Sequence, residues 1–331
     1  DPRADLVAIQ HHDPDTAARV ARDFDVPHAC AAAEQVLDID ALDAVVISST
    51  PHLHYPQARA ALKRGLHVLV EKPMTITADQ AQELVDLAAR QDRQLIVGCT
   101  FHYTDHAAEA RRLIRAGEIG DVKMIHILMT DESSSLYRGE PWERFVKEHH
   151  DEDYMSGTTI APQQGSYNDP AVAGGGQIYA QVSHPAAYVS FLTGDRPQQV
   201  HAHFDNAGLP VDIYDILNIR MDQGTLVSIA SCGSPMGGPR ELPITVYGTG
   251  GTLKIGLADG TMTVYKPDQP PQSPPGLSDY DIYPRYAPAQ NLIDVATGDA
   301  PNRSPGLLGL YSMQIIEAAC QSARTGQNIT I

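Results

Sequence analysis

The stretch that decides the fold is His67-Val68-Leu69-Val70-Glu71-Lys72-Pro73. Its first four residues form a strand-like run, and the charged triplet follows where an open α/β sheet binds its ligands, just beyond the carboxyl ends of the strands. Pro73 fixes its own φ and pushes Lys72 toward extended geometry, so one backbone shape holds the amine. Taken alone, the triplet also fits a surface lysine at a turn. Together with the rest of the chain, it predicts a lysine that orients a substrate hydroxyl.

Short strands and helices alternate through the first hundred residues. Capping residues around Asp13-Pro14-Asp15 and Thr77-Ala78-Asp79-Gln80 mark two helix starts, and Gly65 is placed to end a third helix. The expected strands are 5–10, 44–48, 67–70 and 94–98, and the expected helices end near residues 23, 64 and 90. Repeated β-α-β units predict a parallel sheet with right-handed crossovers. We therefore expect a Rossmann-like α/β domain over residues 1–119.

The pattern changes near Gly120 to longer, alternating strands. Between Val211 and Met221 the apolar side chains share one face, and the carboxylate of Asp215, which we expect to be structural, interrupts it. Further strands are expected at 123–130, 225–231, 243–247, 252–255 and 261–265. We therefore expect an α+β domain over residues 120–331 with a mainly antiparallel sheet. A proline-rich loop at 267–288 is interpreted as a stiff surface excursion, with a polyproline ligand as the alternative. Two helices close the chain, the last ending near Gly326 and packing back on the first domain.

Composition excludes several kinds of partner. The chain has 24 Lys and Arg against 41 Asp and Glu, a net charge of −17 without a basic block, which disfavours nucleic acid. Cys30, Cys99, Cys232 and Cys320 are far apart and lack zinc-site spacing, so we expect reduced thiols and no metal. No apolar run approaches the length of a membrane helix, and no signal peptide is evident. These features predict a cytoplasmic protein without a membrane partner.

The glycine-rich turn of a dinucleotide site has no counterpart in the sequence. Gly248-Thr249-Gly250-Gly251 joins two expected antiparallel strands and has no helix after it, so it is interpreted as a hairpin turn. The chain begins with what would be the second strand of a doubly wound domain. Without the central first strand, two sheet edges would be exposed. We therefore expect a segment with that strand and turn that the given sequence does not contain.

Three motifs resemble, in order and spacing, the glucose-fructose oxidoreductase, inositol dehydrogenase and rhizopine-catabolism (Gfo/Idh/MocA) family. They are Thr50-Pro51-His52-Leu53-His54, Glu71-Lys72-Pro73, and Gly174-Gly175-Gly176 followed by His184. The resemblance implies NAD or NADP in the first domain, and a second domain with the substrate pocket and the oligomer contacts. It implies hydride transfer between the nicotinamide and a secondary hydroxyl of a sugar, glycoside or cyclitol. An exposed sheet face adds the expectation of a homodimer or homotetramer.

His184 is the candidate catalytic base. A neutral imidazole suits removal of a hydroxyl proton near neutral pH, and helical spacing is expected to place Gln177, Gln181 and His184 on one face. The alternative is a structural histidine. By resemblance, Lys72 would orient the hydroxyl and stabilise the developing alkoxide. Family members often carry an aspartate where this chain has Ala180, so we expect no carboxylate to raise the pKa of His184 from that position.

Cofactor contacts are expected at the ends of three strands. Resemblance aligns His11, followed by His12, with the acidic residue that binds the ribose hydroxyls of NAD, and loss of that carboxylate makes NADP compatible. The other candidates by resemblance are Ser49, Thr50, Pro51, His52, His54, Glu71, Lys72 and Pro73. For His52 a surface role is an equal alternative.

The candidate substrate contacts come from both parts of the chain. They are Lys72, His102, Tyr103, Trp142, Tyr167, Gln181 and His184, and Tyr154 is a further candidate for the pocket lining. Trp142, the only tryptophan, could stack on a sugar face or simply pack.

Two other functions remain open. The same scaffold supports a nicotinamide-dependent glycosidase that uses transient oxidation and elimination. A non-catalytic sugar or dinucleotide sensor is the third reading. Net cofactor reduction distinguishes the dehydrogenase from the glycosidase, because a glycosidase recycles its cofactor and a dehydrogenase accumulates the reduced form.

Overall fold

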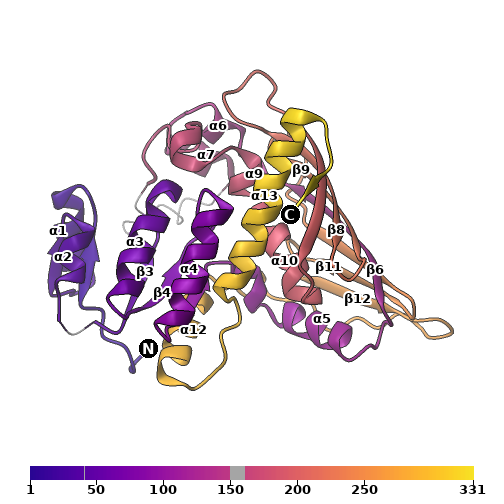
Figure 1. Ribbon diagram of the computed structural model, residues 1–331, viewed down its shortest axis with the longest axis horizontal. Coiled ribbons are helices and arrows are strands. Elements are labelled where there is room, and N and C mark those ends of the chain that lie inside the picture. The colour runs from indigo at the N-terminus through magenta and orange to yellow at the C-terminus, as the bar shows by residue number, and fades with distance from the viewer. Residues whose placement is uncertain (41, 150–160) are drawn as a thin grey trace.

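The structure, a computed structural model, describes residues 1–40, 42–149 and 161–331 (Figure 1). The N-terminal part, in indigo and purple, holds short parallel strands with helices beside them. The C-terminal part holds one large sheet, and the closing helix α13 (Gly306–Thr325) lies between the two (Figure 1). The expected combination of a parallel α/β unit and a larger mixed sheet is confirmed.

The N-terminal strands are parallel, as predicted, but they form two sheets. Strand β1 (Ala8–Gln10) pairs with β2 (His28–Cys30), and a second sheet has the order β3 (Ala44–Ile47), β4 (His67–Val70), β5 (Leu95–Val97). Strands β1 and β3 do not pair with each other, so each has an edge without a strand partner among the described residues. Val46 on the outer strand β3 keeps 56% of its surface exposed.

The helices of this part begin at the predicted capping residues. Asp13 accepts hydrogen bonds from the main-chain N–H groups of Asp15 and Thr16, and Thr77 accepts one from Gln80. The bounds are α1 (Pro14–Asp23), α2 (Ala33–Leu37), α3 (Pro51–Lys63), α4 (Ala78–Arg90), the 3₁₀ helix η1 (Thr100–Tyr103) and α5 (Asp105–Arg115). The short elements β2 and α2 were not predicted, because so few residues carry no periodic signal.

The large sheet has eight strands in the order β12-β11-β10-β6-β9-β8-β7-β13. Every neighbouring pair is antiparallel except β6 and β9, so the prediction of a mainly antiparallel sheet is confirmed. The bounds are β6 (Val122–Thr130), β7 (Pro197–Asp205), β8 (Tyr214–Met221), β9 (Leu226–Cys232), β10 (Pro243–Gly248), β11 (Thr252–Gly256), β12 (Thr261–Tyr265) and β13 (Ile329–Thr330).

One face of this sheet is covered by helices. Leu217, Ile219 and Met221 of β8 are buried, while Ile216 between them is 53% exposed on the other face. Helix α10 (Ser183–Thr193) is buried along nearly its whole length and packs on α13, α5 and strand β6. The alternation that the sequence showed therefore distinguishes the helix-covered face from the open one.

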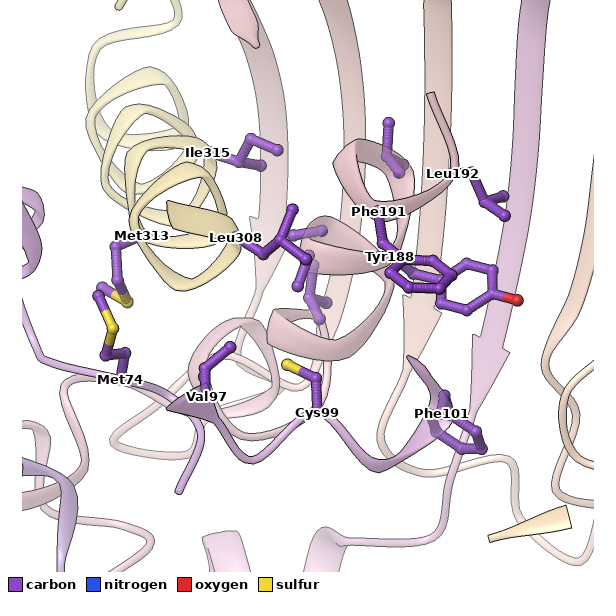
Figure 2. Close-up of a cluster of buried hydrophobic side chains, with 14 of the residues drawn as sticks. Met74, Val97, Cys99, Phe101, Tyr188, Phe191, Leu192, Leu308, Met313 and Ile315 are labelled. Carbon is purple, nitrogen blue, oxygen red and sulfur yellow. The ribbon is translucent and has the colours of Figure 1, made fainter. Parts of the chain in front are cut away.

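Helix α13 joins the two parts of the molecule. It packs on α4, α10 and β7, and Figure 2 shows its Met313 beside Met74, which follows β4. Val97 at the end of β5 lies near Leu308 in the same cluster (Figure 2). Because α13 packs on both parts, we keep the division at residues 119 and 120 as a proposal, with Gly120 in a positive-φ conformation (φ +72°) two residues before β6.

The remaining helices lie in the connections: α6 (Ser134–Tyr137), α7 (Trp142–His149), α8 (Pro170–Ala173), α9 (Gln177–Ala180), α11 (Asp279–Ile282) and α12 (Ala287–Thr297). The proline-rich loop contains α11 and forms one bridge, Gln272 to Val264, with the sheet edge. All four cysteines are free thiols. Across the described ranges, no helix is both long enough and apolar enough for a membrane span.

Candidate active site

The carboxyl ends of β3, β4 and β5 meet at one edge of their sheet. The ladder continues past the strands: the N–H of Glu71 donates to the oxygen of Ile47, and that of Gly98 donates to Val70. Glu71 therefore lies beside Gly98, where a Cβ atom would be 2.9 Å from the Glu71 carboxylate. A larger residue at position 98 would require the Glu71 carboxylate to move. Burial raises the pKa of Glu71, and the charge of Lys72 partly offsets that rise.

Lys72 reaches from this edge to the other part of the molecule. Its Nζ donates a hydrogen bond of 2.8 Å to the main-chain oxygen of Ala180, the last residue of α9. Burial lowers the pKa of Lys72, and the nearby carboxylate of Glu71 counteracts that shift. The Lys72–Pro73 peptide bond is cis. The predicted lysine is thus held at both its backbone and its amine.

The three-glycine turn before α9 is held by Asp212. The carboxylate of Asp212 accepts hydrogen bonds from the N–H groups of Gly176 (2.9 Å) and Ile178 (2.6 Å). A Cβ atom on Gly176 would lie 2.1 Å from the main-chain oxygen of Asp212, so only glycine fits. The turn thereby fixes the start of α9 and, four residues later, the oxygen that Lys72 contacts.

The expectation that Gln177, Gln181 and His184 share one helical face is wrong. Helix α9 ends at Ala180, and α10 begins at Ser183. The amide of Gln177 is fully buried, where it accepts from the hydroxyl of Tyr137 (2.8 Å) and donates to that of Ser231 (2.9 Å). Gln177 therefore supports the turn from the side of the large sheet, and Gln181 lies at the break between the two helices.

His184 lies in the first turn of α10 and is 6% exposed. Its ring meets the edge of Phe101 at 5.4 Å, and its Nδ1 has no hydrogen-bond partner among the described residues. Burial lowers the pKa of His184 well below its usual value, and the charge of Lys72 lowers it further. Arg240 and His102 act in the same direction. The imidazole is therefore neutral near neutral pH and can accept a proton.

Two further residues reach this site from connections that carried no sequence signal. Tyr283, in the proline-rich loop, makes an edge contact with Phe101, with ring centroids 5.0 Å apart. Arg240, between β9 and β10, lies 3.7 Å from Asp131, and its charge lowers the pKa of both Lys72 and His184. Neither position belongs to a periodic pattern, so only the tertiary structure brings them to the site.

His54 contacts the main chain just after two of the strands. It is 1% exposed, and its Nδ1 and Nε2 each lie 2.8 Å from a main-chain oxygen, those of Pro73 and Ser49 respectively. The side chain of Ser49 donates to Gln57. Thr50 caps α3 and Pro51 is its first residue. His54 thus ties the end of β3 to the end of β4.

His52 is placed differently from His54. It is partly exposed in the first turn of α3, and its Nδ1 is buried without a hydrogen-bond partner among the described residues. A buried ring nitrogen without a partner remains available to a ligand at the edge.

His11 and His12 follow β1 on the separate two-stranded sheet. Their ring centroids are 4.3 Å apart with the ring planes tilted by 38°, and both rings line a cavity of about 370 Å³ with Asp13, Thr16, Arg19, Ala161 and Gln163. This cavity contains neither Lys72 nor His184.

His102 and Tyr103 pack in the interior. The Nδ1 of His102 lies 2.9 Å from the hydroxyl of Ser304, and its ring stacks on Phe191 at 4.5 Å. Burial lowers the pKa of His102 to about 3. The hydroxyl of Tyr103 donates to Asn291. Both polar groups thus hold residues of the C-terminal segment against η1.

Trp142 and Tyr167 line one small cavity of about 10 Å³ together with Leu136, Glu140, Pro162, Gln163, Gln164 and Gly165. Trp142 stacks on Phe145 at 4.9 Å. This space is too small for a sugar ring. Tyr154 lies outside the described residues.

The known proteins that this chain resembles share this architecture. The model of the oxidoreductase family with an NAD-binding Rossmann fold, GFO/IDH/MocA, matches residues 1–99, and the GFO/IDH/MocA C-terminal domain matches residues 107–254. The chain belongs to the GFO/IDH/MocA family. Its first hundred residues are therefore an NAD-binding Rossmann domain, and the family resemblance drawn from the three motifs is confirmed.

The sequence identity between this chain and individual members of the GFO/IDH/MocA family is low. An uncharacterised oxidoreductase of Synechocystis is 26% identical over 76% of this chain and 64% of its own length. The dTDP-3,4-didehydro-2,6-dideoxy-α-D-glucose 3-reductase of Streptomyces antibioticus is 35% identical over 39% of either chain. The chain thus spans less than two thirds of these relatives. A levoglucosan dehydrogenase solved with NADH has a TM-score of 0.81 at 18% identity, over 98% of this chain and 90% of its own, which shows the same fold.

Proposed function

We propose that the chain is an NAD(P)-dependent oxidoreductase that moves a hydride between a nicotinamide and a secondary hydroxyl of a sugar, glycoside or cyclitol. One observation carries the proposal: the amine of Lys72 and the unpartnered Nδ1 of His184 lie in one buried environment at the carboxyl edge of a parallel sheet. Open α/β sheets bind their ligands at this edge. The names of the relatives, a sugar-nucleotide reductase and a levoglucosan dehydrogenase, support the substrate class.

The residues at this edge fit the nicotinamide end of a dinucleotide. Gly98 has no side chain to fill the space beside Glu71, and the Nδ1 atoms of His52 and His184 are buried without a hydrogen-bond partner in the described chain. Buried polar atoms of this kind are normally satisfied, so a bound group is the natural partner. When bound, the nicotinamide accepts or donates the hydride. Glu71, Lys72 and Pro73 would hold it against the strand end.

Lys72 is assigned to bind and polarise the substrate hydroxyl. Its amine has three donors, of which Ala180 takes one, so two remain for a substrate oxygen and a further group. Oxidation of the alcohol places negative charge on that oxygen, and a fixed ammonium in a buried site stabilises such charge strongly. The bond to Ala180 prevents the flexible side chain from turning away.

His184 is assigned to take the hydroxyl proton. The ring is neutral at working pH because burial and the charge of Lys72 lower its pKa. Its free Nδ1 supplies the acceptor. Packing against Phe101 limits rotation of the ring, so the acceptor keeps one direction. In the reverse reaction, the same nitrogen returns the proton to the alkoxide.

A panel of sugars, glycosides and inositols, incubated with NAD⁺ and with NADP⁺ separately, tests the function. The expected result is accumulation of reduced nicotinamide with at least one substrate. Cleavage of a glycoside without net cofactor reduction would instead identify a nicotinamide-dependent glycosidase. Binding of sugar or dinucleotide without either reaction would identify a sensor and contradict the proposal.

We also propose that the chain assembles as a homodimer or homotetramer in the cytoplasm. The open face of the large sheet carries apolar side chains that are 41 to 53% exposed, namely Met124, Ile216 and Leu226. An apolar sheet face of this kind marks an interaction surface. The four free cysteines are compatible with a reducing compartment. Light scattering on the purified chain measures the assembly, and a monomer at micromolar concentration would contradict it.

A further inference from the structure

The cavity beside β1 has a lining suited to an anion. It measures about 370 Å³ and is bounded by two imidazoles, His11 and His12, and by the guanidinium of Arg19 on α1. Small-molecule sites of about 300 Å³ and above are common in proteins, so a phosphate-bearing group fits. The end of this strand is the place where a doubly wound domain meets the adenosine ribose of a dinucleotide.

The hydrogen bonds around His11 define which of its nitrogens can contact a ligand. The main-chain N–H of Asp13 lies 3.1 Å from Nδ1 and can only donate, so Nδ1 is the acceptor. The Asp13 oxygen 3.3 Å from the same atom then receives no hydrogen bond from it. The proton of the neutral ring is therefore on Nε2, and this N–H is a donor. A donor suits a phosphate oxygen.

Asp13, the acidic side chain in the described lining, caps helix α1. Asp13 accepts hydrogen bonds from the N–H groups of Asp15 and Thr16 and from the Thr16 hydroxyl at 2.6 Å. Its pKa is lowered, chiefly by the bond to the Thr16 hydroxyl, so it is charged as the cap of α1. A carboxylate that binds ribose hydroxyls must accept from them, and three hydrogen bonds from α1 already engage both oxygens of Asp13, out of about four acceptor sites in a carboxylate.

Arg19 contributes a guanidinium to the lining of the cavity. Its ion pair with Asp23 is 3.4 Å long, and both side chains are 39% exposed. Surface pairs of this geometry contribute little, so a dianionic phosphate competes with Asp23 effectively. Arginine also matches the geometry of phosphate oxygens with paired donors.

We propose that His11, His12 and Arg19 form a binding site for the 2′-phosphate of NADP, so that the chain prefers NADP to NAD. This inference rests on the proposed dinucleotide-dependent function and names which cofactor serves it. The donors in the cavity match a phosphate, while the ribose diol of NAD lacks the carboxylate that would accept from it.

Calorimetry with 2′,5′-ADP and 5′-ADP tests the site without any turnover. The expected result is at least about tenfold tighter binding of 2′,5′-ADP, the effect of one hydrogen bond to a charged group, and the same order for NADP⁺ over NAD⁺. Arg19→Ala should remove most of the difference, and His11→Asp should reverse it. Arg22→Ala, an exposed arginine on the same helix, is the matched control and should retain it.

Equal affinity for the two nucleotides, failure of both to bind, or an unchanged preference in His11→Asp would overturn the inference. These outcomes are distinguishable from failure of the proposed function. Hydride transfer that uses NAD⁺ as well as NADP⁺ would disprove the 2′-phosphate site and leave the dehydrogenase assignment intact. A clear preference for 2′,5′-ADP without any sugar oxidation would support the 2′-phosphate site and contradict the dehydrogenase assignment.

Discussion

The amine of Lys72 donates a 2.8 Å hydrogen bond to the main-chain oxygen of Ala180, which lies 108 positions later in the chain. This bond joins the end of β4 to the break between α9 and α10, and His184 lies in the first turn of α10 on the far side of that break. The segment between α9 and α10 thus positions both the amine of Lys72 and the imidazole of His184. Changes on either side of it should affect the reaction more than the fold.

Replacement of Lys72 by Met should reduce kcat/KM by about 10² to 10³, the usual cost of removing one group that stabilises developing oxyanion charge. Because the charge of Lys72 lowers the pKa of His184, its loss should also move the acidic limb of the pH profile to higher pH. Steady-state kinetics over a pH series measures both effects. Lys123→Met on the exposed side of β6 is the control, and equal losses in the two variants would contradict the role of Lys72.

His184→Asn should reduce kcat by about 10² to 10⁴, as expected for loss of a general base, while the thermal midpoint changes little. In the unmodified protein the base acts as its neutral form, and its pKa is lowered from 6.5. Activity in the oxidation direction should therefore fall only as the pH drops below that value. An essential base that titrates well above neutrality would exclude His184.

We expect Asp215 to make the free energy of unfolding depend on pH. It is 1% exposed on the apolar face of β8, and burial, followed by the neighbouring Asp212, raises its pKa well above 3.8. A carboxyl with a raised native pKa contributes its full stability below the unfolded pKa and loses it as the pH rises through the native pKa. Asp215→Asn should therefore stabilise the protein at pH above neutrality, by about 1 to 2 kcal/mol, and flatten this dependence.

Urea unfolding at several pH values checks the effect of Asp215→Asn, with the exposed Asp5→Asn as control. Asn keeps a donor toward Asp212, so the shape of the site is preserved. Lower stability of Asp215→Asn at every pH would show that the ionised form is required and would refute the protonated assignment.

Gly176→Ala should destabilise the protein by about 1 to 3 kcal/mol, the usual cost of forcing extra volume into a packed site. The new Cβ would meet the main-chain oxygen of Asp212 at 2.1 Å, which the turn cannot avoid without moving. Activity should fall as well, because the turn fixes the Ala180 oxygen. Gly276→Ala, whose nearest neighbour is 3.7 Å away, should be neutral in the same denaturation experiment, and a neutral Gly176→Ala would contradict the close contact.

Local signals predicted much of the fold. The caps at Asp13 and Thr77, the αL residue Gly326 and the alternation along β8 depend on neighbours in the chain, and they appear where the sequence placed them. Parallel pairing of β3, β4 and β5 followed from β-α-β order. The pairing of β1 with β2 did not, because β2 has only three residues and carries no periodic signal.

The candidate site was predictable only in part. Lys72 and His184 were identified from motifs, but the assumption of one continuous helix misplaced Gln177, whose amide serves Tyr137 and Ser231. His102 looked like a cleft residue because it follows a strand end, yet η1 turns its ring into the core. Tyr283 and Arg240 come from irregular connections, where sequence spacing says nothing about distance.

Reduction of NAD(P)⁺ by the substrate panel, measured by absorbance for the unmodified chain, Lys72→Met and His184→Asn, tests the central claim most directly. The account predicts that at least one sugar or cyclitol yields reduced cofactor with the unmodified chain. It also predicts that both variants lose this activity while they unfold at the same thermal midpoint as the unmodified chain. Full activity in either folded variant, or no reduction by any member of the panel, would contradict it.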